Sequence, residues 1–319
     1  MTRLDKGKLL QWAPFLALGA LILFFGLTTP SFLTLSNAAN LASLIPVLLL
    51  AALGQTFVIL MGGIDLSLEG VMALGSVIVG FLVLNPVTSM NLGVWVIPVA
   101  MAVGAGVGLI NGLAHTKLRI PSIMATLGLG FACSGLAVYL IKGNPIRILD
   151  TGLQQLVIGR AFGIPNITWF GLAGLLIAAF ILKKTTFGRY VFAVGGNETI
   201  GAQLGIPVAK VKLFAFTLAG VFYGLAGFLN TIRLASGNAS TSEGFLFSAI
   251  TATVVGGTAL TGGVGGVASA LVGTAIVMVL QNGMILMGLS PYIQDAVQGV
   301  VLISAVAMTI DRSKLAAIK

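Results

Sequence analysis

The sequence has very little charge and almost none of the side chains that carry catalysis or bind metals. Charged residues make up 8 % of its 319 residues, against roughly 25 % in an ordinary soluble domain. It contains one histidine, His115, and one cysteine, Cys133, so a catalytic triad or a metal site has almost no material. We therefore expect no catalytic residue, no metal site and no internal disulfide.

A phosphate-binding loop is also missing. The motif G-x-x-x-x-G-K-[ST] binds the phosphates of ATP through backbone N–H groups and a lysine. Residues 257–262 begin and end with glycine at that spacing, but the lysine does not follow. The chain is therefore not expected to bind ATP in that mode or to hold a cofactor by itself. Any uphill transport would draw its energy from an ion gradient or from a partner.

Long apolar runs fill most of the chain instead. Unpaired backbone groups cost several kcal/mol each in hydrocarbon, so runs of about twenty apolar residues form membrane-spanning helices. The expected fold class is all-α: a polytopic transmembrane helix bundle in a single domain over residues 1–319. Ten spans are expected, at residues 14–29, 38–61, 64–84, 92–114, 121–141, 167–182, 211–234, 247–260, 266–288 and 292–310. Glycines near 61–63 and 260–266 leave nine to eleven spans open.

Basic residues avoid the apolar runs and gather in loops on one side of the predicted membrane. With the N-terminus in the cytoplasm, thirteen of the 17 lysines and arginines face inward. Only Lys142, Arg147, Arg160 and Arg233 face outward. An excess of basic residues in cytoplasmic loops selects this orientation, so both termini are expected in the cytoplasm. The net charge of +9 thus comes from basic residues in the loops beside a lipid membrane, and no nucleic-acid partner is expected.

A short internal repeat suggests two related halves, which are common among transporters. Gly62-Gly63 is repeated as Gly256-Gly257. The pair Asn111-Gly112, followed by Pro121, is repeated as Asn282-Gly283, followed by Pro291. The match is short and dominated by glycine, so coincidence stays open as the other explanation.

Ionisable residues inside predicted spans often mark a transport pathway. An Asp at mid-span costs roughly 2.5–3.5 kcal/mol on insertion scales, so it usually faces water or a partner. Asp65, Glu69 and Asp295 lie near the starts of spans, where a helix N-terminus also stabilises a carboxylate. A structural role and a role in lining a water-filled cavity both stay open. The polar residues expected at or near a translocation path are Asp65, Ser67, Asn111, Gln281 and Asn282.

The longest inward-facing stretch, residues 183–212, contains a turn signal. Two glycines and Asn197 form the turn, and Asn197 is expected to cap a short helix over residues 198–204. A capped helix flanked by basic residues is suited to docking a partner. A solvated loop with a helix on the membrane surface explains the same pattern, so both interpretations stay open.

Four stretches between Gly62 and Tyr292 carry a family resemblance. They include Gly62-Gly63-Ile64-Asp65-Leu66-Ser67, Gly108-Leu109-Ile110-Asn111-Gly112, Phe187-Gly188-Arg189-Tyr190 with Gly195-Gly196-Asn197-Glu198, and Gly256-Gly257-Thr258 with Ser290-Pro291-Tyr292. With these stretches the sequence resembles the inner-membrane permeases of ribose-type sugar ABC importers, a binding-protein-dependent monosaccharide family. Each stretch alone is a weak signal. Together they cover nearly the whole chain and are specific.

The resemblance implies a set of partners in a bacterial inner membrane. They are a second permease subunit, expected to be an identical copy, and two cytoplasmic ATPase subunits or one double-cassette ATPase, which would bind ATP and Mg. A periplasmic sugar-binding protein would dock on the outward loops, residues 142–166 and 236–243. The segment at about 185–210 resembles the part that docks into the ATPase. Its expected coupling residues are Phe187, Gly188, Arg189, Gly195, Gly196, Asn197, Glu198 and Gly205.

The sequence departs from the family pattern at two places. Thr199, Ile200, Gly201 and Ala202 stand where relatives commonly have a second Glu, two Ala and an Arg. Glu69 stands where many relatives have Gly. The first departure leaves the accepted ATPase open, and the second leaves the role of Glu69 open.

The function expected from all of this is that of a permease subunit, not an enzyme, which moves a small sugar by alternating access driven by partner ATPases. The cargo could also be a nucleoside or a branched-chain amino acid. An ion-coupled secondary transporter, resting on Asp65, Glu69 and Asp295, is the main rival. A non-transporting membrane scaffold would leave the coupling-type segment unexplained.

Overall fold

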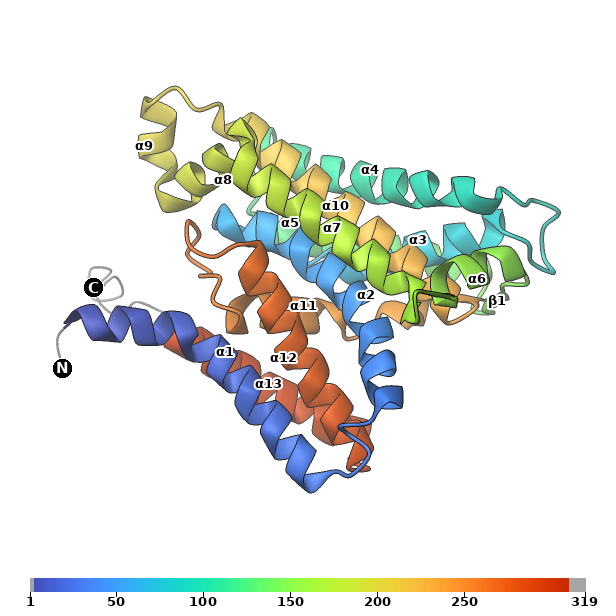
Figure 1. Ribbon diagram of the computed structural model, residues 1–319. Coiled ribbons are helices and arrows are strands. Elements are labelled where there is room, and N and C mark those ends of the chain that lie inside the picture. Colours follow the sequence, from blue (N-terminus) through green and yellow to red (C-terminus); the bar gives the residue numbers. More distant parts are fainter. Residues whose placement is uncertain (1–2, 310–319) are drawn as a thin grey trace.

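The computed structural model describes the backbone of residues 3–309 and the side chains of residues 12–307, and most of this chain is helical (Figure 1). The α-helices are α1 (Arg3–Thr28), α2 (Leu35–Leu60), α3 (Leu68–Leu82), α4 (Val96–Thr116), α5 (Ser122–Ile141), α6 (Thr151–Ile158), α7 (Asn166–Lys184), α8 (Thr186–Gly196), α9 (Glu198–Gln203), α10 (Val208–Arg233), α11 (Phe245–Val255), α12 (Val267–Leu286) and α13 (Pro291–Thr309). Two short 3-10 helices are η1 (Gly93–Trp95) and η2 (Ala239–Ser242).

The strands are only two residues long. β1 (Ile146–Arg147) pairs antiparallel with β4 (Ser236–Gly237), so that the two loops expected to face outward lie together. β2 (Arg160–Ala161) pairs antiparallel with β3 (Ile164–Pro165) in a hairpin that precedes α7.

Six helices in the described chain are long and apolar enough to cross a membrane. They are α2, α4 with η1, α5, α7, α10 and α12. Shorter apolar helices lie at Trp12–Thr28, Leu68–Leu82 and Pro291–Ala307. A run of about 20 apolar residues matches the roughly 30 Å of hydrocarbon in a bilayer. The prediction of a polytopic helical membrane protein is confirmed.

Two predicted spans are shorter than expected. The span at 64–84 begins as a helix only at Leu68, and the span at 247–260 contains α11, which has 11 residues and ends at Val255. At 1.5 Å per residue α11 is about 17 Å long, so the prediction of a continuous helix over 247–260 is wrong. The helices are interrupted where glycines adopt positive φ angles, at Gly62 (78°) and Gly257 (103°).

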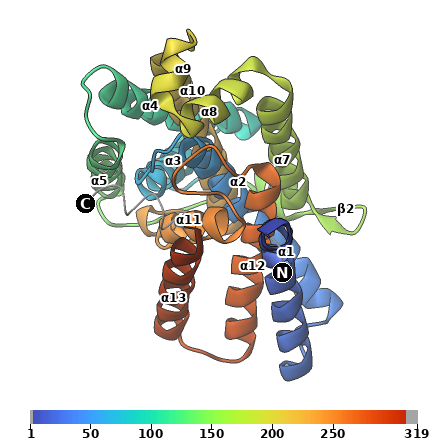
Figure 2. The ribbon, with the colours of Figure 1, turned by 90° about the vertical axis from the view of Figure 1, so that its left-hand side faces the viewer.

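The helices form two groups that share a central layer. Helices α4, α7 and α10 lie on one side of α2, and α1, α12 and α13 lie on the other, with α3 and α11 between (Figures 1 and 2). The buried core runs through α2, where all residues from Pro46 to Leu60 are buried. A helix that is apolar on all sides and covered by neighbours on all sides belongs in the middle of such a bundle.

Helices α4 and α10 touch through their backbones. A Cβ atom added to Gly104 would lie 2.0 Å from the carbonyl oxygen of Gly220, and one added to Gly224 would lie 2.2 Å from that of Ala100. Gly108 faces the carbonyl oxygen of Phe216 in the same way, at 2.2 Å. Small residues permit this closeness, which stabilises helix pairs in a solvent as apolar as their own side chains.

The packing of α2–α5 is repeated by α10–α13. Helix α10 packs on α3 and α4, and α2 packs on α11 and α12; α3 contacts α5 as α11 contacts α13. Asn111 and Asn282 each lie fifteen residues after the first residue of their helices, α4 and α12. The glycine pairs do not correspond, because Gly62-Gly63 follows α2 whereas Gly256-Gly257 follows α11.

Candidate functional site

Helices α8 and α9 form a protrusion at one end of the molecule (Figure 1). The side chain of Thr185 accepts a hydrogen bond from the Gly188 N–H at 3.1 Å and so caps α8. The side chain of Asn197 accepts one from the Ile200 N–H at 3.0 Å and caps α9, which confirms the predicted cap. After α9 the chain turns at Gly205, whose φ angle is 80°, and enters α10.

The predicted coupling residues divide into an anchored set and an exposed set. Phe187 stacks its ring against Phe57 of α2, with ring centroids 6.4 Å apart, and contacts Phe214 of α10. Gly188 is buried against α7. The exposed members are Arg189, Gly196, Asn197, Glu198 and Gly205. The first set fixes α8 to the bundle, while the second lies on the surface of the protrusion.

Glu198 holds α9 against α10. Lys212 Nζ lies 2.8 and 2.7 Å from the two carboxylate oxygens of Glu198. The Glu198 side chain is 55 % exposed and that of Lys212 only 15 %, so the carboxylate is the part of the pair that faces outward. Exposed pairs of this kind stabilise a protein by only about 0–1 kcal/mol. The pair therefore positions α9 more than it stabilises the fold.

The surface of α9 also presents two apolar side chains that the sequence reasoning missed. Ile200 is 52 % exposed and Leu204 is 77 % exposed. Exposed apolar residues beside charged ones are common at surfaces that bind another protein. In the sequence they are two apolar residues four positions apart, which gives no signal that both are exposed.

Gly195, at the end of α8, joins three parts of the chain. A Cβ atom here would lie 1.7 Å from the carbonyl oxygen of Leu60, the last residue of α2, and 2.6 Å from the Gly263 nitrogen. The Gly263 N–H donates a hydrogen bond to that same Leu60 oxygen at 2.9 Å. A Cβ atom on Gly262 would lie 2.7 Å from the Gly62 nitrogen. We call this contact between residues 60–63, 195–196 and 262–263 the glycine junction.

Three of the five residues predicted on the translocation path lie together in the interior. Ser67 Oγ donates to Asp65 Oδ1 at 2.6 Å, and Asn111 Nδ2 donates to Ser67 Oγ at 2.8 Å. All three residues are at most 1 % exposed. Asp65 Oδ2 and Asn111 Oδ1 have no hydrogen-bond partner within the described residues. The cluster fixes the non-helical segment before α3 against α4, and its part in translocation stays a prediction.

The other two predicted path residues lie on α12, away from that cluster. The side-chain amides of Asn282 and Asn37 exchange two hydrogen bonds, both 2.9 Å, and tie α12 to the start of α2. Gln281 lines a cavity of about 200 Å³ together with Arg233. Asn37 was missed by sequence reasoning because nothing in the sequence relates it to a residue 245 positions away.

Glu69 has a partner that the sequence did not predict. Its Oε1 accepts a hydrogen bond from the Leu246 N–H at 3.0 Å, in the first turn of α11. The Ser242 hydroxyl donates to the Glu69 backbone oxygen at 3.0 Å. The first N–H groups of a helix have no partner within it and favour a negative charge. Glu69 of α3 therefore caps α11.

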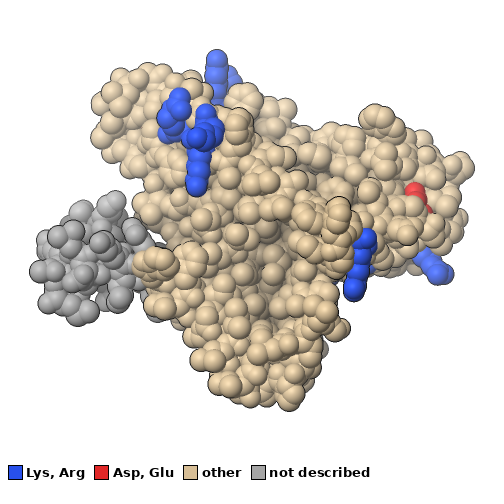
Figure 3. All heavy atoms as spheres, in the orientation of Figure 1, with Lys and Arg blue, Asp and Glu red and all other residues tan. Residues whose placement is uncertain are grey.

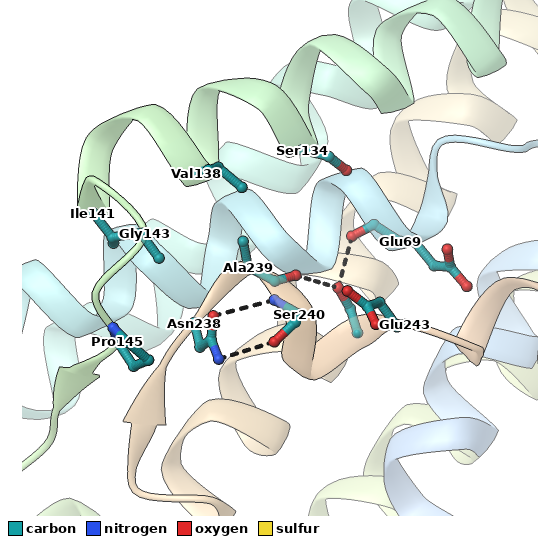
Figure 4. Close-up of a pocket in the computed structure, with 11 residues that line it drawn as sticks. Glu69, Ser134, Val138, Ile141, Gly143, Pro145, Asn238, Ala239, Ser240 and Glu243 are labelled. Carbon is teal, nitrogen blue, oxygen red and sulfur yellow. Dashed lines mark hydrogen bonds between the residues drawn. The ribbon is translucent and has the colours of Figure 1, made fainter. Parts of the chain in front are cut away.

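A cavity of about 420 Å³ lies beside Glu69. Ser134 and Val138 of α5 line one wall, and Asn238, Ser240 and Glu243 of the 236–243 loop line the other (Figure 4). The loop is held in shape by its own hydrogen bonds, such as Asn238 Nδ2 to Ser240 Oγ at 2.9 Å. The wall from the loop is polar, and hydroxyl groups line both walls.

Figure 3 shows a group of lysines and arginines at the end of the molecule that carries α8 and α9, and others towards the opposite end. The first residues of α1 and the last of α13 lie towards the end that carries α8 and α9 (Figure 1). The basic residues close to the protrusion in the chain are Lys183, Lys184, Arg189, Lys210 and Lys212.

Comparison with known proteins gives a family model and several relatives. Residues 37–306 match the family described as branched-chain amino acid transport system / permease component. The ribose import permease protein RbsC of Bacillus subtilis (strain 168) is 37 % identical over 315 residues, which cover 97 % of this chain and 95 % of the relative.

Two further relatives come from Escherichia coli (strain K12). The ribose import permease protein RbsC is 33 % identical, with 94 % of each chain covered. The L-arabinose transport system permease protein AraH is 33 % identical, with 93 % of this chain and 89 % of the relative covered. No solved structure matches the chain.

Proposed function

The chain belongs to the branched-chain amino acid transport system / permease component family, and we propose that within it the chain is the membrane-spanning permease subunit of an ATP-driven importer of a small sugar. The observation that carries this function is the near-full-length match to ribose and arabinose permeases, at 33–37 % identity. The amino-acid cargo in the family description is not what these relatives carry by name. A ribose-type monosaccharide is therefore the favoured cargo.

Partners follow from what the chain does not contain. With no phosphate loop in the sequence, ATP and Mg would be bound by cytoplasmic ATPase subunits, either two or one with two cassettes. A second copy of the permease would complete the pathway, and a periplasmic sugar-binding protein would deliver the cargo. The docking surface for the ATPase is the exposed side of α8 and α9, including Ile200 and Leu204, which are 52 % and 77 % exposed.

The orientation follows from charge. The end that carries α8 and α9 is assigned to the cytoplasm, because thirteen of the 17 lysines and arginines belong to the loops and termini expected on that side. With that placement both termini are cytoplasmic and the chain crosses a bacterial inner membrane ten times, α3 and α11 being shortened crossings. The repeated packing of α2–α5 and α10–α13 supports two related halves.

Coupling would run through the glycine junction. When the ATPases close on ATP, they would push α8 and α9 towards the bundle. Gly195 touches both the end of α2 and the segment 259–263 without any side chain between them, so a displacement of α8 reaches both at once. The interrupted helices at these two places give the bundle parts that can change conformation between outward and inward openings.

An ion-coupled carrier receives no support from the arrangement of its three acidic residues. Asp65 is buried beside Asn111, Glu69 caps α11, and Asp295 lies on α13. A proton relay needs ionisable groups in a chain across the membrane, and these three do not form one within the described residues.

Uptake into proteoliposomes tests the proposal. Vesicles that contain the chain, its ATPase and ATP should accumulate labelled D-ribose or L-arabinose when the binding protein is supplied at the opposite face. Vesicles without the ATPase should not, even with a proton or sodium gradient. Gradient-driven uptake without the ATPase would contradict the proposal and support a carrier. Addition of unlabelled nucleosides or branched-chain amino acids as competitors would identify a different cargo.

A further inference from the structure

Asp295 exposes a carboxylate on the side of an apolar helix. It is the fifth residue of α13, beyond the first turn in which a helix N-terminus stabilises an anion best. The residue is exposed, and no ion pair or hydrogen bond of its carboxylate is seen among the described residues. A carboxylate that faces lipid tails is costly, and such residues usually face a partner or a water-filled cavity. Asp295 therefore needs water or a ligand beside it.

A cavity of about 360 Å³ lies at this position, between α11 and α13. From α13 it is lined by Asp295, Gln298, Gly299 and the apolar Leu302, which are spaced to share one face of the helix. From α11 it is lined by Phe247 and Thr251. The volume is within the 300–1,000 Å³ that is usual for small-molecule sites.

The polar side chains in this cavity are held in place, but some of their hydrogen-bonding atoms have no partner among the described residues. Gln298 Oε1 accepts a hydrogen bond from Ser248 Oγ at 3.3 Å, which orients the amide across the gap between α13 and α11. Its amide nitrogen has no partner within the described chain. Thr251 is only 1 % exposed, yet its hydroxyl makes no hydrogen bond to the described residues. A solute could therefore form hydrogen bonds with these groups before any existing hydrogen bond has to break.

The cavity also has an apolar wall suited to a sugar ring. Phe247 is 59 % exposed and lines the cavity opposite the polar face of α13. The negative face of an aromatic ring attracts positively polarised hydrogens, such as the C–H groups on one side of a pyranose or furanose. Sugar hydroxyls on the other side would donate to the Asp295 carboxylate and accept from the Gln298 amide. An ionised or purely apolar solute would match only part of this lining.

We propose that the cavity formed by Phe247, Thr251, Asp295 and Gln298 is a solute-contact site on the translocation path, and that it takes a small polyhydroxylated solute of the monosaccharide class. This inference rests on the proposed function, because it names a contact that the cargo makes on its way. The path then runs along the α11–α13 side of the bundle. A site with so few hydrogen-bonding groups binds weakly, which lets the solute leave quickly.

Cysteine labelling tests the location. The chain has one cysteine, Cys133, which is buried, so a Cys133→Ala background allows single cysteines to be read separately. We expect Asp295→Cys and Gln298→Cys to react with a membrane-impermeant thiol reagent added from outside, and D-ribose to slow the reaction more than sodium chloride of equal osmolarity. Val300→Cys is the matched control, since Val300 is 64 % exposed but lies about 140° around α13 from Asp295.

Two results of the labelling would overturn the site. One is equal or faster labelling at Val300→Cys, and the other is labelling at 295 and 298 that D-ribose does not slow. Absence of any reaction at 295 and 298 in protein that still transports would overturn it as well, because a water-filled path must admit the reagent.

Transport measurements separate this inference from the proposed function. In proteoliposomes with the ATPase and the loaded binding protein, we expect Asp295→Ala and Gln298→Ala to lower D-ribose uptake about three- to tenfold, the effect of a lost hydrogen bond. ATP hydrolysis should stay within about twofold of wild type, because docking is untouched. Normal uptake in both variants would overturn the solute site alone. If the wild-type chain with its partners took up no sugar, the proposed function itself would fail.

Discussion

Single residues decide how tightly the coupling protrusion is joined to the bundle. At Gly195 three backbone segments approach so closely that no side chain fits, whereas a Cβ atom on its neighbour Gly196 would meet nothing within 4 Å. The two glycines are adjacent in α8 and equal in helix propensity, but Gly195 is half-buried and Gly196 is exposed. They therefore form a natural pair of test and control.

Gly195→Ala should separate ATP hydrolysis from uptake. The added methyl group would lie 1.7 Å from the Leu60 carbonyl oxygen, so the glycine junction must open. We expect sugar uptake to fall at least tenfold while the ATPase still binds, and Gly196→Ala to retain uptake within about twofold. Uptake and ATPase activity are measured on the same proteoliposomes. Equal uptake by the two variants would contradict a role for the junction in coupling.

The Asn37–Asn282 pair gives a prediction about stability. Loss of one amide leaves the other buried without its partner, which should lower the free energy of unfolding by about 1–2 kcal/mol. The loss is smaller if the unfolded chain in the membrane offers the amide other hydrogen-bond partners. Asn37→Leu and Asn282→Leu should each lower the Tm in detergent. The double variant should have a Tm no lower than that of the less stable single variant. Strictly additive losses would show that the two side chains do not interact.

At the scale of elements, the helix α11 depends on a residue from another helix. Its first N–H groups have no partner within the helix, and the Glu69 carboxylate of α3 accepts a hydrogen bond from the Leu246 N–H at 3.0 Å. This contact gives Glu69 a structural role that joins α3 to α11.

Glu69→Ala should loosen the first turn of α11, whereas Glu69→Gln should loosen it less. The glutamine keeps an acceptor for the Leu246 N–H but loses the charge that favours the helix N-terminus, and a lost cap costs about 0.5–2 kcal/mol. Hydrogen exchange at residues 245–249 measures the effect. Unchanged exchange in Glu69→Ala would show that α11 is held by its packing alone.

The sequence predicted the elements better than it predicted their interruptions. Apolar runs located a helix within every predicted span, because bilayer thickness and backbone hydrogen bonding leave no other choice. The length of α11 could not be predicted, since α11 ends at Val255 where the next residue, Gly256, lies against the backbone of Ser269 in α12. The cap at Asn197 is a local interaction and was predicted correctly.

The candidate sites show the same division between local and distant interactions. Asp65 and Ser67 are two residues apart, and their contact is of the kind that a sequence reveals. The cavity beside Asp295 needs α11 and α13 to be placed next to each other, which no spacing in the sequence encodes. Sequence reasoning placed Asp295 at a helix start. Its position in the second turn of α13 became visible only in the structure.

At the scale of the whole molecule, Glu198 is the residue whose two roles can be separated. It pairs with Lys212 within the chain, and in the proposed function it also belongs to the surface that docks the ATPase. Glu198→Arg should abolish coupled uptake, because it repels Lys212 and reverses the charge on the docking surface. Uptake by proteoliposomes with the intact partners measures the effect, with membrane insertion as the control.

The charge exchange Glu198→Lys with Lys212→Glu distinguishes the two roles. It restores an ion pair between α9 and α10 but presents a cation to the partner. If docking is the main role, uptake should stay at least fivefold below wild type, since losing a charged contact across an interface costs more than an exposed pair within a chain. Full recovery of uptake would show that Glu198 acts only by holding α9 in place.

The backbone contact between α4 and α10 limits which parts of this protein can change. Where main chains interlock at three successive levels, neither helix can rotate or take on a bulkier residue without forcing the pair apart, so the two should travel as one rigid body through every cycle. Substitutions should then accumulate mainly on the other side of α2, among α1, α12 and α13. New cargo preferences would arise there by exchange of a few side chains, while the α4–α10 pair stays unchanged.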